Sequence, residues 1–130
     1  MRPIAIFMVA GVLAPVIAAA QTKADHYYSA TYKTCLNGAM STLQMKGCIA
    51  DEYETWDKQL NQTYQALMAR RAPTDQTKLR DDERAWLKRT KHKCDHAGDD
   101  EAGGTLQGVE IDQCNVDETI LRTVYLRGPR

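Results

Sequence analysis

The stretch from residue 41 to residue 71 constrains the fold of this chain more than any other. Its large apolar residues recur in steps of three or four, which places them on one face of an α-helix. Ser41 followed by Gln44 is typical of a capping box, and Pro73 ends the pattern because proline cannot continue a helix. The sequence therefore predicts one long amphipathic helix, whose apolar face the rest of the chain must cover. That face consists of Met45, Ile49, Tyr53, Trp56, Leu60, Tyr64 and Leu67.

The same periodicity predicts two further long helices. Thr74 or Asp75 can cap a helix that runs to about Cys94, and a third helix is expected over residues 111–126. Because the connection at residues 71–75 is short, the first two helices should be antiparallel neighbours, with Trp56 and Trp86 facing one core. The face expected for the second helix consists of Leu79, Glu83, Trp86, Thr90 and Cys94, and that of the third helix of Cys114, Leu121 and Tyr125.

The segment before the first long helix is rich in tyrosine. Tyr28, Tyr32 and Cys35 share a helical spacing, which favours a short helix ending near Asn37 and Gly38, although Asn-Gly suits a turn equally well. The tyrosines could form a binding surface, but packing on the core beside the first long helix is the commoner use of such residues. The predicted fold is all-α: a small antiparallel helical bundle of about three main helices, stapled by two disulfides.

Residues 1–20 have the pattern of a secretory signal peptide. Arg2 supplies the positive start, residues 4–17 are apolar, and Ala18 to Ala20 supply the small residues that a signal peptidase requires. The alternative is a membrane anchor, but the apolar run is short and has no flanking basic stop. We expect cleavage after Ala20, a mature domain over residues 21–130 and a periplasmic or secreted location without a stable membrane anchor.

The four cysteines fit that location, because disulfides persist in oxidising compartments. Cys35, Cys48, Cys94 and Cys114 allow three pairings, and crossed pairs remain open because antiparallel helices would gather all four at one end. The pairs Cys35–Cys48 and Cys94–Cys114 are favoured, since each closes one local loop. No Cys-x-x-Cys is present, which argues against a thiol oxidoreductase.

Charge and motif content exclude several other classes of function. The chain of 130 residues has 17 basic and 17 acidic side chains, and loss of residues 1–20 leaves 16 against 17. This balance argues against a nucleic-acid surface, which needs a basic excess. His92, Cys94 and His96 could bind zinc, but the favoured disulfide removes the thiol, so we expect no metal and no cofactor.

Acidic residues on the first long helix are the other candidate for chemistry. Asp51, Glu52, Glu54 and Asp57 could contain an acid and base pair. A solvated helical face near the positive end of a helix explains them without catalysis. We therefore predict that the protein is not an enzyme.

Three segments contribute to an ordered set of residues. The first long helix contributes Met45, Cys48, Tyr53, Asp57, Leu60, Asn61 and Tyr64. The second contributes Leu79, Arg80, Glu83, Arg84, Ala85, Trp86, Leu87 and Cys94. The closing segment contributes Gly103, Gly104, Thr105, Cys114, Thr119, Arg122 and Leu126. This set, over roughly residues 35–126, resembles LprI-like lysozyme-inhibitor domains.

The chain departs from this family at two places. Glu83 stands where the family usually has Gln, and Thr90 and Lys91 stand where it tends to have Arg-Asp, so a charge pair is missing or displaced. The resemblance implies a small, exported, all-helical domain held by disulfides, and a protein that binds lysozyme-type muramidases.

Two functions follow as hypotheses. The first is inhibition of a lysozyme-type muramidase, whose cleft is lined by carboxylates; the second is an envelope interaction or structural module with an unrelated partner. A wall-degrading enzyme is a distant third. Candidate partner-binding residues are the cations Lys88, Arg89, Lys91 and Lys93 and the acids Asp99, Asp100 and Glu101. The core is predicted to contain Trp56, Leu60, Tyr64, Leu79, Trp86 and Leu121.

Overall fold

The computed structural model describes residues 23–128 and is all-helical over that range. Three long helices dominate it: α2 (Thr42–Ala69), α3 (Pro73–Asp95) and α4 (Gln107–Arg127). A shorter helix, α1 (Ala30–Gly38), and two 3-10 turns, η1 (Asp25–Tyr27) and η2 (Asp99–Glu101), complete the elements. The short helix expected to end near Asn37 and Gly38 is α1, so the count of about three main helices is one too low. The predicted signal peptide lies outside the described residues.

Helix α2 begins and ends close to the predicted bounds. The Ser41 hydroxyl accepts a hydrogen bond from the Gln44 amide, and the Gln44 side chain accepts one from the Met40 amide. Ile49, Trp56 and Leu60 are buried along its predicted face. Tyr53 is an exception: 41% of its surface is exposed.

Helix α3 begins at Pro73, so the prediction of a Thr74 or Asp75 cap is wrong. Ala72 occupies the N-cap position without a side-chain hydrogen bond. Proline suits the first helical position because its missing N–H would be unpaired there and its fixed φ is already helical. Along α3, which the structure describes in full, the buried residues are Leu79, Thr90 and Cys94.

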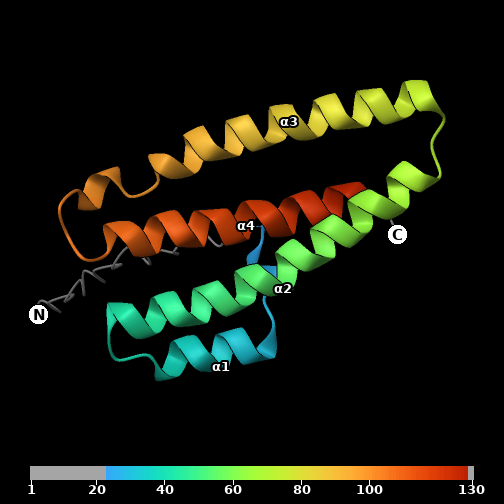
Figure 1. Ribbon diagram of the computed structural model, residues 1–130. Coiled ribbons are helices and arrows are strands. Elements are labelled where there is room, and N and C mark those ends of the chain that lie inside the picture. Colours follow the sequence, from blue (N-terminus) through green and yellow to red (C-terminus); the bar gives the residue numbers. More distant parts are fainter. Residues whose placement is uncertain (1–22, 129–130) are drawn as a thin grey trace, which may run out of the picture.

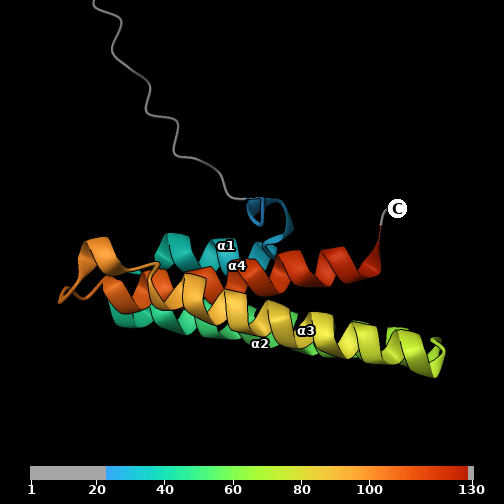
Figure 2. The same ribbon diagram turned by 90° about the horizontal axis from the view of Figure 1, so that it is seen from above.

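Helix α4 lies in the angle between α2 and α3, which diverge from their short connection (Figure 1). It packs along α2, with which it runs in the same direction, and along α3, with which it is antiparallel. Seen from above, α4 and α1 form one layer and α2 and α3 the other (Figure 2). The expectation that these two helices are antiparallel neighbours holds only in part: α2 and α3 are antiparallel, but they diverge, and each packs mainly against α4 rather than against the other.

This arrangement divides the core in two. Trp56 belongs to one cluster with Val116 and Ile120, whereas Trp86 packs against a second cluster of Leu60, Leu79 and Leu126. The two tryptophans do not share a core, contrary to the prediction. Of the predicted core residues, Trp56, Leu60 and Leu79 are buried, while Tyr64, Trp86 and Leu121 are partly buried.

The third long helix begins earlier and faces differently from the prediction. It starts at residue 107 rather than about 111, and Tyr125, expected on the inner face, is 68% exposed. Apolar and polar residues alternate around α4, so the spacing of its apolar residues did not define which face of the helix is buried. The buried residues are Val109, Val116, Thr119, Ile120, Arg122, Thr123 and Leu126.

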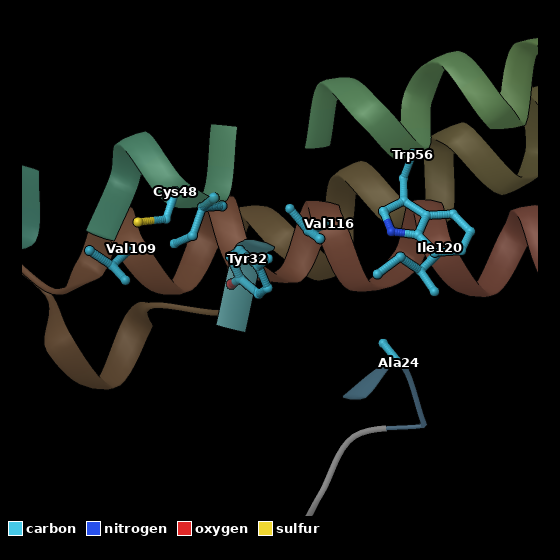
Figure 3. Packing of buried hydrophobic residues seen from close by; sticks show 8 residues of the cluster. Ala24, Tyr32, Cys48, Trp56, Val109, Val116 and Ile120 are labelled. Atoms are coloured by element: carbon cyan, nitrogen blue, oxygen red, sulfur yellow. The ribbon is translucent and has the colours of Figure 1, made fainter. Parts of the chain in front are cut away.

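The segment before α2 folds back onto α4. Tyr32 is buried in the cluster that contains Trp56, Val116 and Ile120. Ala24 belongs to the same cluster and points toward Ile120 (Figure 3). The hydroxyls of Tyr28 and Tyr32 donate to Asp117 and Gln113 of α4. The tyrosines therefore act as core and anchoring residues, with Tyr32 buried.

Glu52 corrects the prediction of a solvated acidic face on α2. Its side chain is buried and accepts hydrogen bonds from the Ser29 amide at 2.8 Å, the Ser29 hydroxyl at 2.7 Å and the Trp56 indole N–H at 3.1 Å. The Ser29 hydroxyl also caps α1 by accepting from the Tyr32 amide. Glu52 thus ties the start of α1 to the middle of α2.

Two disulfides fasten the elements at one end of the molecule. Cys35 is bonded to Cys48, which joins α1 to α2, and Cys94 is bonded to Cys114, which joins the end of α3 to α4. These are the pairs that the local-loop argument favoured. Between residues 23 and 128, no helix is both long and apolar enough to span a membrane.

Candidate functional site

A groove runs between α2 and α3, and α4 contributes one residue to its lining. It encloses about 350 Å³. Its residues come from three helices because α2 and α3 diverge around α4. They are Tyr53, Asp57, Leu60, Asn61, Tyr64 and Gln65 of α2, Arg80, Glu83, Arg84, Trp86 and Leu87 of α3, and Thr119 of α4.

The groove combines a buried floor with half-exposed apolar walls. Leu60 and Thr119 are buried, whereas Tyr64 and Trp86 are partly buried. Leu87 is 54% exposed and Tyr53 is 41% exposed. Exposed large apolar side chains that gather around a hollow, uncovered by any residue in the range 23–128, are typical of a contact surface.

Charged groups of opposite sign border the two walls. On α2, the half-buried Asp57 carboxylate accepts a hydrogen bond of 3.1 Å from the Asn61 side chain. On α3, Arg80 donates to the Thr77 hydroxyl at 3.2 Å, and Arg84 lies 3.8 Å from Asp81. The basic groups at the α3 edge are therefore exposed and only loosely paired.

Arg122 of α4 fastens the α3 wall from beneath. Its side chain is buried and pairs with Asp82 at 2.7 Å and with Glu83 at 2.6 Å. Its guanidinium also lies 5.5 Å from the Trp86 ring centre and 5.2 Å from that of Tyr125, within the range of cation–π attraction. Burial alone would lower the pKa of Arg122, but the hydrogen bonds and charges of Asp82 and Glu83 raise it above its usual value.

The structure pairs Arg122 with two acids of α3 and places Arg84 beside Asp81 of α3. The arginine that acts between helices is thus Arg122, and it connects α4 to α3.

A second hollow of about 400 Å³ continues the groove toward the start of α2. It is lined by Ile49, Ala50 and Tyr53 of α2 and by Asp112 and Asn115 of α4. Tyr53 lines both hollows and stands between them. Together the two hollows form an elongated trough along one side of α2.

The partner-binding residues predicted from the sequence lie elsewhere, toward the end of α3 and in the following turn. Lys88 and Arg89 are exposed. Lys91 pairs with Asp95 at 2.6 Å, and Lys93 pairs with Glu118 of α4. These side chains are not among those that line the groove.

The acids of the predicted partner-binding set are in η2. Asp99 lies 2.9 Å from the His96 ring nitrogen, and Asp100 and Glu101 are exposed in the same turn. The His92 and His96 rings are 5.0 Å apart. In residues 23–128 no three His, Cys, Asp or Glu side chains are grouped so as to hold a metal ion.

Comparison with known proteins identifies the family. The family described as lysozyme inhibitor LprI matches residues 34–126, which include all four cysteines. The chain belongs to the LprI lysozyme inhibitor family. This is a family of inhibitors rather than a class of enzyme, and membership together with the two disulfides indicates an extracytoplasmic protein with lysozyme-type partners in general.

An uncharacterized protein of Rhizobium meliloti (strain 1021) is similar to this LprI-family chain. The two are 26% identical over 102 residues, which cover 68% of this chain and 73% of the relative. No solved structure matches the chain significantly.

Half of the residues by which the chain resembles the LprI family line the groove. Every lining residue except Gln65 belongs to that set. The two departures from the family pattern have different environments: Glu83 pairs with Arg122, while Thr90 is buried and Lys91 is exposed. Sequence reasoning missed the groove because its residues are dispersed over three helices, although the resemblance had named most of them.

Proposed function

We propose that this protein is exported, is released from its signal peptide after Ala20, and binds and inhibits lysozyme-type muramidases. Membership of the LprI family and the two disulfides support this proposal. The mature domain would act by forming a complex, because a bound protein can block access to the cleft of a glycosidase without doing chemistry itself.

The observation that carries the proposal is the groove. Large apolar side chains are usually buried in the core, yet Tyr53 and Leu87 on the two walls are about half exposed. Half-exposed aromatic side chains beside a hollow are typical of protein contact sites, where tyrosine and tryptophan are enriched. We therefore place the main partner contact in the groove.

The cations at residues 88–93 and the acids at residues 99–101 remain a proposed second contact area. They lie on the same helix as the α3 wall and in the turn that follows it. Because most of them are exposed and several are already paired at the surface, each contributes little to binding by itself. They are expected to affect the association rate more than the lifetime of the complex.

A turnover assay with the purified, oxidised domain tests the function. We expect stoichiometric inhibition of an animal-type or a bacterial muramidase at micromolar protein. The double variant Tyr53→Ala/Leu87→Ala should weaken inhibition by about tenfold or more. Leu43→Ala is the matched control, because Leu43 is 80% exposed on α2 and does not line the groove.

Two outcomes would contradict the proposal in different ways. If no muramidase is inhibited, the inhibitor function is wrong, and an envelope interaction module with another partner becomes the better hypothesis. If inhibition occurs but is equally strong in the double variant, the function stands and the groove is not the contact site.

A further inference from the structure

The outer edge of the α3 wall carries a row of cations. Arg80, Arg84 and Lys88 follow one another at intervals of four residues, so they lie along one side of the helix. All three are exposed, and the Arg84 side chain is 76% exposed. We call these three residues the basic edge.

The basic edge lies at the border of the groove. Helix α3 is attached to α4 where Leu79, Thr90 and Cys94 are buried and Asp82 and Glu83 bind Arg122. Arg80 and Arg84 are exposed and line the groove, and Lys88 follows them on α3 outside the lining. We call this exposed border of α3 the α3 ridge.

The stability of the free protein does not explain this row. Like charges four residues apart on a helix repel one another and mildly destabilise it. Arg84 has its nearest acidic partner at 3.8 Å, and the Arg80 guanidinium bonds to a neutral hydroxyl. The guanidinium groups are therefore available to a negatively charged partner.

The spacing of the two arginines matches a feature of glycosidases. Four residues of helix rise by about 6 Å, while the two catalytic carboxyl groups of a glycosidase are about 5 to 9.5 Å apart. A guanidinium binds a carboxylate through two parallel hydrogen bonds, which makes arginine better suited than lysine to this contact.

We propose that Arg80 and Arg84 bind the two catalytic carboxylates of the muramidase, so that the α3 ridge occupies the substrate cleft. One edge of that cleft then lies in the groove and contacts Tyr53 and Leu87. This inference rests on the proposed inhibitor function and specifies its mode: inhibition is competitive with the glycan substrate.

Steady-state kinetics with a soluble chitooligosaccharide substrate test this mode. The wild-type protein is expected to raise the apparent KM of the muramidase and leave kcat unchanged. Arg80→Glu/Arg84→Glu should raise the inhibition constant by about 100-fold, because two charge-assisted contacts are lost and two repulsive ones are introduced. Arg80→Lys/Arg84→Lys should retain part of the inhibition, since the charges remain.

The matched control is Lys58→Glu/Lys78→Glu, which changes the net charge by the same amount. Lys58 and Lys78 are exposed and lie outside the groove. This variant should change the inhibition constant by less than about threefold, as expected for exposed surface charges outside the proposed contact. Matching thermal unfolding of all variants by circular dichroism shows that each is folded.

The muramidase itself supplies the second readout. An enzyme variant in which both catalytic carboxylates are replaced by amides should bind the wild-type protein more weakly, measured by calorimetry without any turnover. Unchanged binding to that variant, inhibition that lowers kcat alone, or full inhibition by Arg80→Glu/Arg84→Glu would each overturn the carboxylate contact while leaving the inhibitor function intact. Absence of inhibition by the wild type would overturn both.

Discussion

At the scale of single residues, the buried carboxylate of Glu52 connects the N-terminal segment to α2. It accepts three hydrogen bonds, two from Ser29 and one from the Trp56 indole. A buried carboxylate of this kind is stable only while its donors stay in place. It therefore defines where the N-terminal segment crosses α2.

Replacing Glu52 with alanine should lower the free energy of unfolding by about 2–4 kcal/mol, because buried donors of Ser29 and Trp56 lose their acceptor. Urea unfolding followed by tryptophan fluorescence measures this change. Glu54→Ala, at an exposed position of the same helix, should stay within about 0.5 kcal/mol of the wild type. Equal effects of the two variants would show that the Glu52 hydrogen bonds contribute nothing.

Tyr32 makes stability depend on pH in the alkaline range. Burial raises the pKa of its phenol from 10.0 to about 12; the hydrogen bond with Gln113 lowers it somewhat, and the charges of Asp117, Glu52 and Asp25 add to the rise. Its contribution to stability is complete below pH 10 and is lost between pH 10 and 12, because the unfolded chain releases the proton first.

The urea midpoint should therefore fall as pH rises from 10 to 12. Tyr32→Phe should flatten this decrease, since the ionisable group is gone. Tyr28→Phe serves as a comparison that removes a neighbouring hydroxyl bonded to the same helix. An unchanged slope in Tyr32→Phe would show that other groups cause the alkaline loss.

At the scale of elements, α3 is held by a few strong contacts rather than by a broad apolar face. Few apolar side chains of α3 are buried, so they contribute little to holding this helix in place. The pairs of Arg122 with Asp82 and Glu83 supply much of the attachment of α3 to α4. Because Arg122 also stacks on Trp86, one side chain sets the position of the α3 wall of the groove.

Arg122→Ala should cost about 3–5 kcal/mol, as for a buried ion pair that loses one partner. Hydrogen exchange should accelerate most in the first half of α3, while the amides of α2 stay protected. Arg84→Ala removes only the exposed pair with Asp81 and should cost less than about 1 kcal/mol. Uniform acceleration over all helices would contradict a local role for Arg122.

At the scale of the whole molecule, the two disulfides join different pairs of helices. The Cys35–Cys48 bond closes α1 onto α2 across 13 residues, and the Cys94–Cys114 bond closes α3 onto α4 across 20 residues. Each is expected to stabilise the domain by about 3 kcal/mol. The groove depends on the second bond, because that bond limits how far α3 can swing from α4.

The paired variants Cys35→Ser/Cys48→Ser and Cys94→Ser/Cys114→Ser should differ in function more than in stability. Both should unfold at a lower urea concentration, because each loses about 3 kcal/mol of the free energy of unfolding. Loss of the Cys94–Cys114 bond should weaken muramidase inhibition more, since the α3 wall is freed. Greater loss of inhibition in the Cys35–Cys48 variant would place the contact on the α1 side instead.

Much of the secondary structure follows from the sequence alone. The 3.6-residue period located α2 and its buried Trp56 and Leu60, Ser41 and Gln44 located its start, and local loop closure favoured the observed disulfides. These features depend on residues close in the chain, so local spacing is sufficient to predict them.

Only the tertiary structure decided which helices touch. Periodicity assigns a face to each helix but does not say which neighbour covers it, so the packing of α4 against both α2 and α3 and the separation of Trp56 from Trp86 were not predictable. The same holds for the burial of Glu52 and the exposure of Tyr53, whose positions on α2 differ by one residue. The groove exists because α2 and α3 diverge while both pack against α4, a relation between segments far apart in the chain.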